Sequence, residues 1–233
     1  MDQRGFPRSG TEAWQGAPEV AESFRVTLAS LMRENGAGNR PQTILVTSPR
    51  PAEGKTTIAS NLGVALAETG RRVLLVDADC RRPFLHKMFG VPNTWGLTNI
   101  LAGDSEISDQ LGIPTRFPGL MLLPNGPPPE SVSRVLYSPR LGKFFQWARG
   151  NVDLILIDAP PILEVADARV ISEFADGAVL VLRSGSTARA DALQAYQQLY
   201  EDGTLLLGTV LNDWRRPARD RHYYSYYLAP RES

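Results

Sequence analysis

Short apolar runs recur along this chain, and several of them lack the strict alternation with polar residues that marks a strand exposed on one face. They cover residues 43–47, 73–76, 120–123, 154–157, 178–182 and 205–211. Apolar runs without alternation are typical of strands covered on both faces. Helical patterns lie between them, over residues 56–69, 83–89, 139–149, 167–174 and 188–201. The repeated strand–helix–strand order predicts an α/β fold, with a parallel β-sheet flanked by helices on both faces.

Composition excludes several classes of protein. The 233 residues are 42% hydrophobic, and 25 Lys and Arg residues balance 25 Asp and Glu residues. Zero net charge argues against a generally basic nucleic-acid coat and against an acidic disordered chain. A single cysteine, Cys80, and two histidines exclude a disulfide framework and a Cys-rich zinc site. Because neither a membrane-spanning run nor the apolar core of a signal peptide is found, we expect a cytoplasmic location.

The pattern divides the chain into three parts. Residues 1–17 are rich in Gly, Pro, Ser and charge without periodicity, which predicts a disordered N-terminal arm. Apolar residues then recur at helical spacing from residue 18 to residue 32, and an Asn-Gly-Ala-Gly sequence at 35–38 ends this helix. We expect one domain over residues 18–213 and a flexible tail over residues 214–233.

A phosphate-binding loop is the strongest chemical signal. The strand at 43–47 runs into a loop that ends in Gly54-Lys55-Thr56, where a helical pattern begins. A helix N-terminus presents unpaired N–H groups to phosphate, Lys55 reaches the outer phosphates, and the Thr56 hydroxyl can bind Mg²⁺. The full motif has Gly where this chain has Pro49. The residues expected to hold the nucleotide are Pro51, Ala52, Glu53, Gly54, Lys55, Thr56 and Thr57.

Two other strands end in carboxylates. The run at 73–76 continues into Asp77 and Asp79, and the run at 154–157 continues into Asp158. In a parallel sheet the C-terminal strand ends form the ligand-binding edge, so these side chains are expected beside the phosphate loop. There they can hold Mg²⁺ or act as a base. The simpler interpretation is that an Asp at a strand end caps the next turn or helix.

Three segments together resemble the bacterial tyrosine kinases of exopolysaccharide and capsule export. They are the loop ending at Thr56, the Asp-Ala-Asp-Cys-Arg-Arg-Pro sequence at 77–83, and the Ile-Asp-Ala-Pro-Pro sequence at 157–161. Segments 96–101, 181–185 and 211–212 are also similar, so the resemblance extends from about residue 18 to residue 212. It implies a P-loop NTPase-like fold, ATP and Mg²⁺ as cofactors, and protein-tyrosine autokinase activity.

The resemblance also implies roles for individual residues. The residues expected to be catalytic are Lys55, Asp77, Asp79 and Asp158, and it stays open whether Asp77 or Asp79 takes the proton of the acceptor tyrosine. The expected Mg²⁺ ligands are Thr56, Asp77 and Asp158. Arg183 and Asn212 are expected to contact the nucleotide, Asn212 beside the adenine.

The C-terminal tail carries four of the seven tyrosines. They are Tyr223, Tyr224, Tyr226 and Tyr227. Dense aromatic residues in a polar tail have no apolar partners with which to form a core, although an aromatic edge that packs elsewhere is the alternative. In the resembled family such a cluster is the phosphorylation substrate. Since the tail lies close in sequence to Asn212, transfer in trans between neighbouring chains is expected.

Two departures from the family pattern concern assembly. The N-terminal helix of the family carries Glu-x-x-Arg-x-x-Arg, whereas this chain has Glu22, Arg25 and then Leu28. After the Pro-rich loop, Arg134 stands where the family tends to have an acidic residue. Both changes weaken the expectation of a ring built through the usual contacts. The nucleotide site is unaffected by them.

Two other functions compete with the kinase. One is a non-kinase ATPase of the cell-division or chromosome-partitioning type, a nucleotide-switched dimer; Arg50 favours it because related ATPases have a lysine there that reaches across the dimer. The other is a basic tail that binds nucleic acid through Arg215, Arg216, Arg219 and Arg221. Zero net charge argues against the latter, so no nucleic-acid partner is expected.

The resemblance implies partners as well. Kinases of this family need a membrane-anchored activator, a polysaccharide co-polymerase, which either is a separate protein or belongs to a longer product containing this chain. We therefore expect recruitment to the inner face of the plasma membrane through that partner. Self-association for phosphorylation in trans and a cognate phosphatase complete the expected set.

Overall fold

The computed structural model of the protein describes residues 18–32, 40–104, 106–107 and 112–214. The expected N-terminal arm and the four tail tyrosines lie outside these residues. The strands are β1 (Thr43–Thr47), β2 (Val73–Asp77), β3 (Ile113–Pro114), β4 (Leu120–Leu123), β5 (Leu154–Asp158), β6 (Gly177–Arg183) and β7 (Leu206–Asn212). The helices are α2 (Pro18–Leu31), α3 (Lys55–Glu68), α4 (Leu85–Phe89), α5 (Leu97–Ala102), α6 (Val132–Leu136), α7 (Arg140–Asn151), α8 (Asp167–Ser172) and α9 (Arg189–Glu201).

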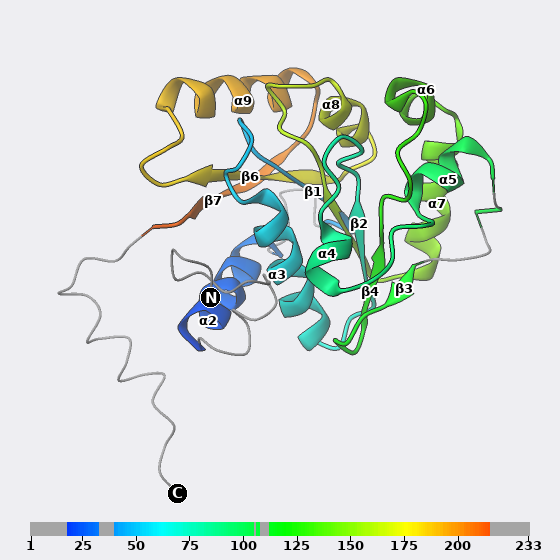
Figure 1. The fold of residues 1–233 in the computed structure, drawn as a ribbon. Coiled ribbons are helices and arrows are strands. Elements are labelled where there is room, and N and C mark those ends of the chain that lie inside the picture. Colours follow the sequence, from blue (N-terminus) through cyan, green and yellow to red (C-terminus); the bar gives the residue numbers. More distant parts are fainter. Residues whose placement is uncertain (1–17, 33–39, 105, 108–111, 215–233) are drawn as a thin grey trace, which may run out of the picture.

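The strands form a single seven-stranded sheet in the order β3-β4-β2-β5-β1-β6-β7 (Figure 1). All neighbouring pairs are parallel except β3 and β4, which are antiparallel. The predicted α/β fold is therefore confirmed, and the sheet differs from the prediction only by a two-residue antiparallel edge strand. Such an edge on an otherwise parallel sheet is common in α/β folds. Its two residues, Ile113 and Pro114, are too few to show a strand pattern in the sequence.

Each face of the sheet carries its own hydrophobic cluster. Alternate residues of the central strands point to opposite faces, so Leu74 joins the cluster under α5, α7, α8 and α9, whereas Leu75 joins the cluster under α2, α3 and α4. Both residues are fully buried, as is every residue of β1, β2 and β5. This two-sided burial explains why the sequence of these strands does not alternate.

The N-terminal helix α2 lies beside α3 (Figure 1). Phe24, Leu28 and Leu31 are buried in the cluster that α2 shares with α3. Arg25 donates to Glu68 on α3 at 3.2 Å and to Glu22 at 3.2 Å. Leu28, the departure from the family pattern, thus packs into the core rather than presenting a polar group at the surface. In the described residues, no helix has the length and apolar character that crossing a membrane requires.

The structure places the predicted strands within one or two residues of their expected limits. The sequence did not predict α5 and α6, which have 6 and 5 residues. One or two helical turns are too short to show a 3.6-residue periodicity. Both helices pack on the same face of the sheet as α7 and α8.

Candidate active site

The loop between β1 and α3 curls around the position expected for phosphates. Gly54, the residue before α3, has a φ of 95°, and Ala52 has a φ of 63°. Left-handed residues in such a loop turn successive backbone N–H groups towards one side, which forms a concave anion site. A side chain at position 54 would overlap Asn212, since an added Cβ would lie 2.0 Å from its Nδ2. Gly54 is therefore required both by its backbone conformation and by this contact.

Glu53 braces this loop from inside. Its carboxylate accepts a hydrogen bond from the Arg50 backbone N–H at 2.9 Å and another from the Thr187 hydroxyl. The residue is 3% exposed. The sequence predicted Glu53 only as a nucleotide contact; because its side chain is engaged within the fold, it can offer a nucleotide only its backbone N–H.

Arg183 and Asn212 approach the same loop from the ends of β6 and β7. The Asn212 amide donates to the Glu53 carbonyl at 3.0 Å, and Arg183 donates to the Ala52 carbonyl at 3.1 Å. Arg183 also donates to Asp213 at 3.1 Å. The structure thus places both predicted nucleotide contacts against the phosphate loop, although they come from distant parts of the sequence.

Three carboxylates meet the lysine of the loop at the C-terminal strand ends. Asp77 and Asp158 end β2 and β5 and are paired in register. The Lys55 ammonium lies 2.8 Å from Asp79 and 3.8 Å from Asp158, and it lies 3.4 Å from the Thr56 hydroxyl. The sheet register therefore brings together all four residues expected to be catalytic.

Burial shifts the protonation of this cluster. Burial, followed by the negative charge of Asp158, raises the pKa of Asp77 to about 8. Burial also raises the pKa of Asp158 to about 6, against the opposing positive charge of Lys55. For Lys55 burial lowers the pKa, but the charges of Asp158 and Asp79 outweigh it and leave the pKa above its usual value. Strongly shifted groups gathered at a ligand edge are typical of functional sites.

The capping interpretation holds for one oxygen of Asp77 and for one oxygen of Asp79, which accepts the Arg82 backbone N–H at 3.0 Å. One oxygen of Asp77 accepts the backbone N–H groups of Phe84 and Leu85, each at 3.0 Å, at the start of α4. The other Asp77 oxygen and both oxygens of Asp158 are buried without a hydrogen-bond partner in the described structure. Native proteins rarely leave buried carboxylate oxygens unpaired, so these atoms indicate a site for a cation.

These oxygens fit a magnesium ion. The candidate ligands Thr56, Asp77 and Asp158 offer only oxygen, which Mg²⁺ prefers. Among the described residues no group of three or more His, Cys, Asp or Glu residues forms a metal cage by itself. One or two carboxylates completed by substrate phosphates are the usual arrangement for Mg²⁺ at nucleotides, and this cluster matches it.

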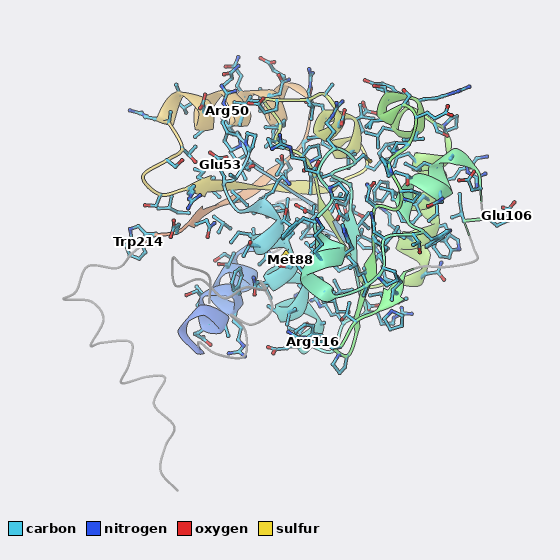
Figure 2. The ribbon with its side chains drawn as sticks, viewed as in Figure 1. Arg50, Glu53, Met88, Glu106, Arg116 and Trp214 are labelled. Atoms are coloured by element: carbon cyan, nitrogen blue, oxygen red, sulfur yellow. The ribbon has the colours of Figure 1, made fainter. Side chains whose placement is uncertain are left out.

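Arg50 is held within its own chain. Its guanidinium donates to Glu164 at 2.7 Å and to Asp191 on α9 at 3.1 Å. Figure 2 shows Arg50 at the same end of the molecule as Glu53, on the outer side of the phosphate loop. Both of its carboxylate contacts are internal, so in this structure Arg50 does not extend away from its own chain as a residue reaching across a dimer would.

A pocket of about 270 Å³ opens beside Lys55 and Asp79. The phosphate loop, the segment after β2 and the turn after β5 supply its walls, through Pro51, Ala52, Lys55, Asp79, Arg81, Arg82, Pro160, Pro161, Glu164 and Val165. The sequence patterns alone assign no role to Arg81 or Arg82. The signal was present, because both directly follow the Asp-x-Asp segment, but the sequence does not show that the chain turns there back over the pocket.

Comparison with known proteins agrees with this geometry. The model of the CobQ/CobB/MinD/ParA nucleotide binding domain family matches residues 44–229. The chain is 37% identical over 207 residues to the tyrosine-protein kinase YwqD of Bacillus subtilis (strain 168), which covers 89% of this chain and 86% of that protein. The chain belongs to the bacterial tyrosine kinase family.

Within this family the relatives differ in length. The tyrosine-protein kinase wzc of Salmonella typhimurium is 34% identical over 211 residues, which are 91% of this chain but only 29% of that protein. The present chain therefore spans less than a third of wzc and most of YwqD.

Among solved structures, a tyrosine kinase domain is more similar to this chain than a cell-division ATPase is. The BceF tyrosine kinase domain is 34% identical with a TM-score of 0.75, covering 85% of this chain and 80% of that one. The septum site-determining protein MinD from Pyrococcus horikoshii OT3, complexed with Mg-ADP, is 30% identical with a TM-score of 0.65, covering 81% and 77%. Both share the nucleotide-binding fold, and the tyrosine kinase domain is the better fit.

Proposed function

We propose that this chain is an ATP- and Mg²⁺-dependent protein-tyrosine autokinase that regulates exopolysaccharide or capsule polymerisation and export. The observation that carries the proposal is the cluster in which Lys55 meets Asp79 and Asp158 beside a phosphate loop. Relatives named tyrosine-protein kinases support it, since they match nearly the whole chain.

The nucleotide would be held by the loop from Pro51 to Thr57. Backbone N–H groups and Lys55 would neutralise its phosphates, while Arg183 and Asn212 would fix the loop from the nucleoside side. A bound Mg²⁺, held through Thr56, Asp77 and Asp158, supplies charge neutralisation for the transferring phosphoryl group. Phosphoryl transfer asks the protein mainly for such positioning and charge compensation.

Asp79 is the better candidate for the base. It lines the pocket beside Lys55, whereas Asp77 is fully buried and tied to the start of α4. The tyrosine oxygen forms a bond to the γ-phosphorus, the bond from that phosphorus to the β–γ bridging oxygen breaks, and ADP leaves. The phenolic proton passes to a carboxylate oxygen, which we assign to Asp79. Free tyrosine has a pKa of ~10, so this acceptor aids the reaction.

The substrate of this reaction would be the tail of a neighbouring chain, at Tyr223, Tyr224, Tyr226 and Tyr227. A membrane-anchored co-polymerase would activate the kinase and recruit it from the cytoplasm to the plasma membrane, and a cognate phosphatase would reset it. Buried Leu28 and exposed Arg134 lower the expectation of a ring that uses the family's usual contacts.

Phosphotyrosine mapping tests the proposal. The full chain is incubated with ATP and Mg²⁺, and its modified residues are located by mass spectrometry. Three tyrosines outside the tail serve as internal controls, because Tyr137, Tyr196 and Tyr200 are 69%, 46% and 73% exposed. Phosphate confined to the tail supports the proposal. Phosphate mainly at the three controls would refute the tail as substrate, and ATP hydrolysis without phosphotyrosine would favour the ATPase.

A further inference from the structure

Most charges around the pocket beside Asp79 are balanced by close partners. Lys55 lies 2.8 Å from Asp79, and Glu164 lies 2.7 Å from Arg50. Arg81 donates to Asp167 at 2.8 and 3.2 Å, and the Asp167 side chain is 7% exposed. These three ion pairs leave little net charge at the pocket wall.

Arg82 differs from these residues. It is exposed and lines the pocket, and in the described part of the chain no carboxylate forms an ion pair with its guanidinium. Its backbone is held close to the candidate base, since its N–H donates to the Asp79 side chain at 3.0 Å. The pocket thus carries an unbalanced positive charge three residues from the candidate base.

The remaining walls suit an aromatic side chain. Pro160 and Pro161 are buried, Val165 is partly buried, and all three line the pocket. The volume of about 270 Å³ is sufficient for an aromatic side chain beside the phosphate loop. The phenol of an acceptor tyrosine that enters this pocket would contact Asp79 and Lys55. The residues next to that tyrosine in the substrate sequence would then lie near Arg82.

We propose that Arg82 selects acceptor tyrosines that have an anionic group, a carboxylate or a phosphotyrosine, next to them in sequence. The inference rests on the kinase activity proposed above. Arginine binds carboxylate and phosphate oxygens through paired N–H groups, and these charge-assisted bonds are stronger than neutral ones. The unmodified tail has Arg221 and His222 immediately before Tyr223, so it is poorly matched to Arg82. Its first phosphorylation would be slow, and each phosphotyrosine would promote modification of the next tyrosine.

Peptides test this inference. The full chain, with its four tail tyrosines changed to Phe, phosphorylates peptides that contain one acceptor tyrosine flanked by Ala, Arg, Glu or phosphotyrosine, and kcat/KM is measured for each. Relative to Ala, we expect a gain of about threefold for Glu and about tenfold for phosphotyrosine at low ionic strength. The Glu-flanked peptide represents an acidic second substrate, and the phosphotyrosine-flanked peptide represents progressive modification of the tyrosine cluster. Comparing the two therefore distinguishes these sources of the anionic group.

Arg82→Gln should reduce both ratios to about 1, and Arg82→Lys should keep part of the preference because the charge remains. The matched control is Arg116→Gln, which removes a positive charge at the opposite end of the sheet (Figure 2). Equal kcat/KM for all peptides in the unmodified protein, or an unchanged preference in Arg82→Gln, would overturn the inference. An equal loss of preference in the Arg116 control would also overturn it. If no peptide is phosphorylated even with the membrane-anchored activator present, the proposed kinase activity fails instead.

Discussion

The two cations of the phosphate loop, Lys55 and Arg50, each contact two carboxylates in very different surroundings. Lys55 and its partners Asp79 and Asp158 have side chains that are 12%, 5% and 1% exposed. Arg50 and its partners Glu164 and Asp191 are 45%, 41% and 26% exposed. Removing one partner of a buried pair costs ~3–5 kcal/mol, whereas an exposed pair is worth ~0–1 kcal/mol.

The difference arises from where the partners lie. Asp158 ends a buried strand and Asp79 lies two residues beyond another, so water is excluded from both carboxylates, and the Asp158 oxygens have no hydrogen-bond partner in the described structure. Glu164 and Asp191 belong to a surface turn and to α9, where water competes for every contact. The phosphate loop therefore contains a buried lysine, Lys55, placed among carboxylates at the candidate site. Its arginine, Arg50, only links the loop to Glu164 and Asp191 at the surface. Four predictions test this contrast.

The largest effect is expected for Lys55→Met. ATP affinity should fall by about 30-fold to about 3,000-fold, because truncating one partner of a buried charged contact costs ~2–5 kcal/mol and each 1.4 kcal/mol is tenfold. Calorimetry measures the affinity, and thermal melting shows whether the variant is folded. Lys143→Met, which changes an exposed lysine on α7, is the control. Unchanged ATP affinity in folded Lys55→Met would refute the assignment of this lysine.

The next prediction distinguishes the roles of Asp77 and Asp79. Asp79→Asn and Asp77→Asn should both bind ATP, and both should lose at least about 10²-fold in autophosphorylation, the scale for losing a general base. Higher Mg²⁺ concentration should restore part of the rate in Asp77→Asn, because that residue is assigned to the metal. Higher Mg²⁺ concentration should not restore the autophosphorylation rate of Asp79→Asn. The rate of phosphotyrosine formation across a Mg²⁺ titration checks this.

Full rates in both aspartate variants would contradict the kinase mechanism and favour the ATPase. Partial rescue of Asp79→Asn by Mg²⁺, with none for Asp77→Asn, would exchange the two assignments. The two aspartates thus serve as controls for each other, since they lie two residues apart and undergo the same substitution.

The sequence predicted much of this contrast. Buried strands that end in Asp77 and Asp158 had to meet the loop of Lys55, because parallel strands share one C-terminal edge. The partners of Arg50 could not be predicted, since Glu164 and Asp191 lie 114 and 141 residues away and belong to no motif. The internal role of Glu53 was missed for the same reason. Local patterns predict strand ends, but contacts between surface loops depend on the final packing.

A smaller effect concerns pH. Burial, and then the charge of Asp158, raises the pKa of Asp77 to about 8, so the folded protein keeps a proton that the unfolded chain releases above about pH 4. Stability should therefore fall as pH rises from about 4 to about 8. Asp77→Asn should show a smaller drop in melting temperature between pH 5 and pH 8, measured without nucleotide or Mg²⁺.

The control for this experiment is Asp153→Asn. The pKa of Asp153 lies below its usual value because the Arg72 backbone N–H and guanidinium donate to it. It is therefore ionised in both folded and unfolded protein between pH 5 and pH 8, and its removal should leave the drop unchanged. Equal drops in the unmodified protein and in Asp77→Asn would show that Asp77 is ionised in the folded state.

The smallest effect is expected for Arg50→Ala. Its guanidinium is exposed and bound to Glu164 and Asp191 within the chain, and exposed ion pairs are worth ~0–1 kcal/mol, so ATP binding and autophosphorylation should change by less than about fivefold. The backbone N–H that donates to Glu53 remains in the variant. In a nucleotide-switched dimer, where this residue would reach a neighbour's phosphates, the loss would approach the ~10³-fold or more of an arginine finger. Measured turnover therefore separates the two functions by more than two orders of magnitude. A loss on the larger scale would mean that Arg50 leaves its internal partners during the reaction, and the contrast with Lys55 would not hold.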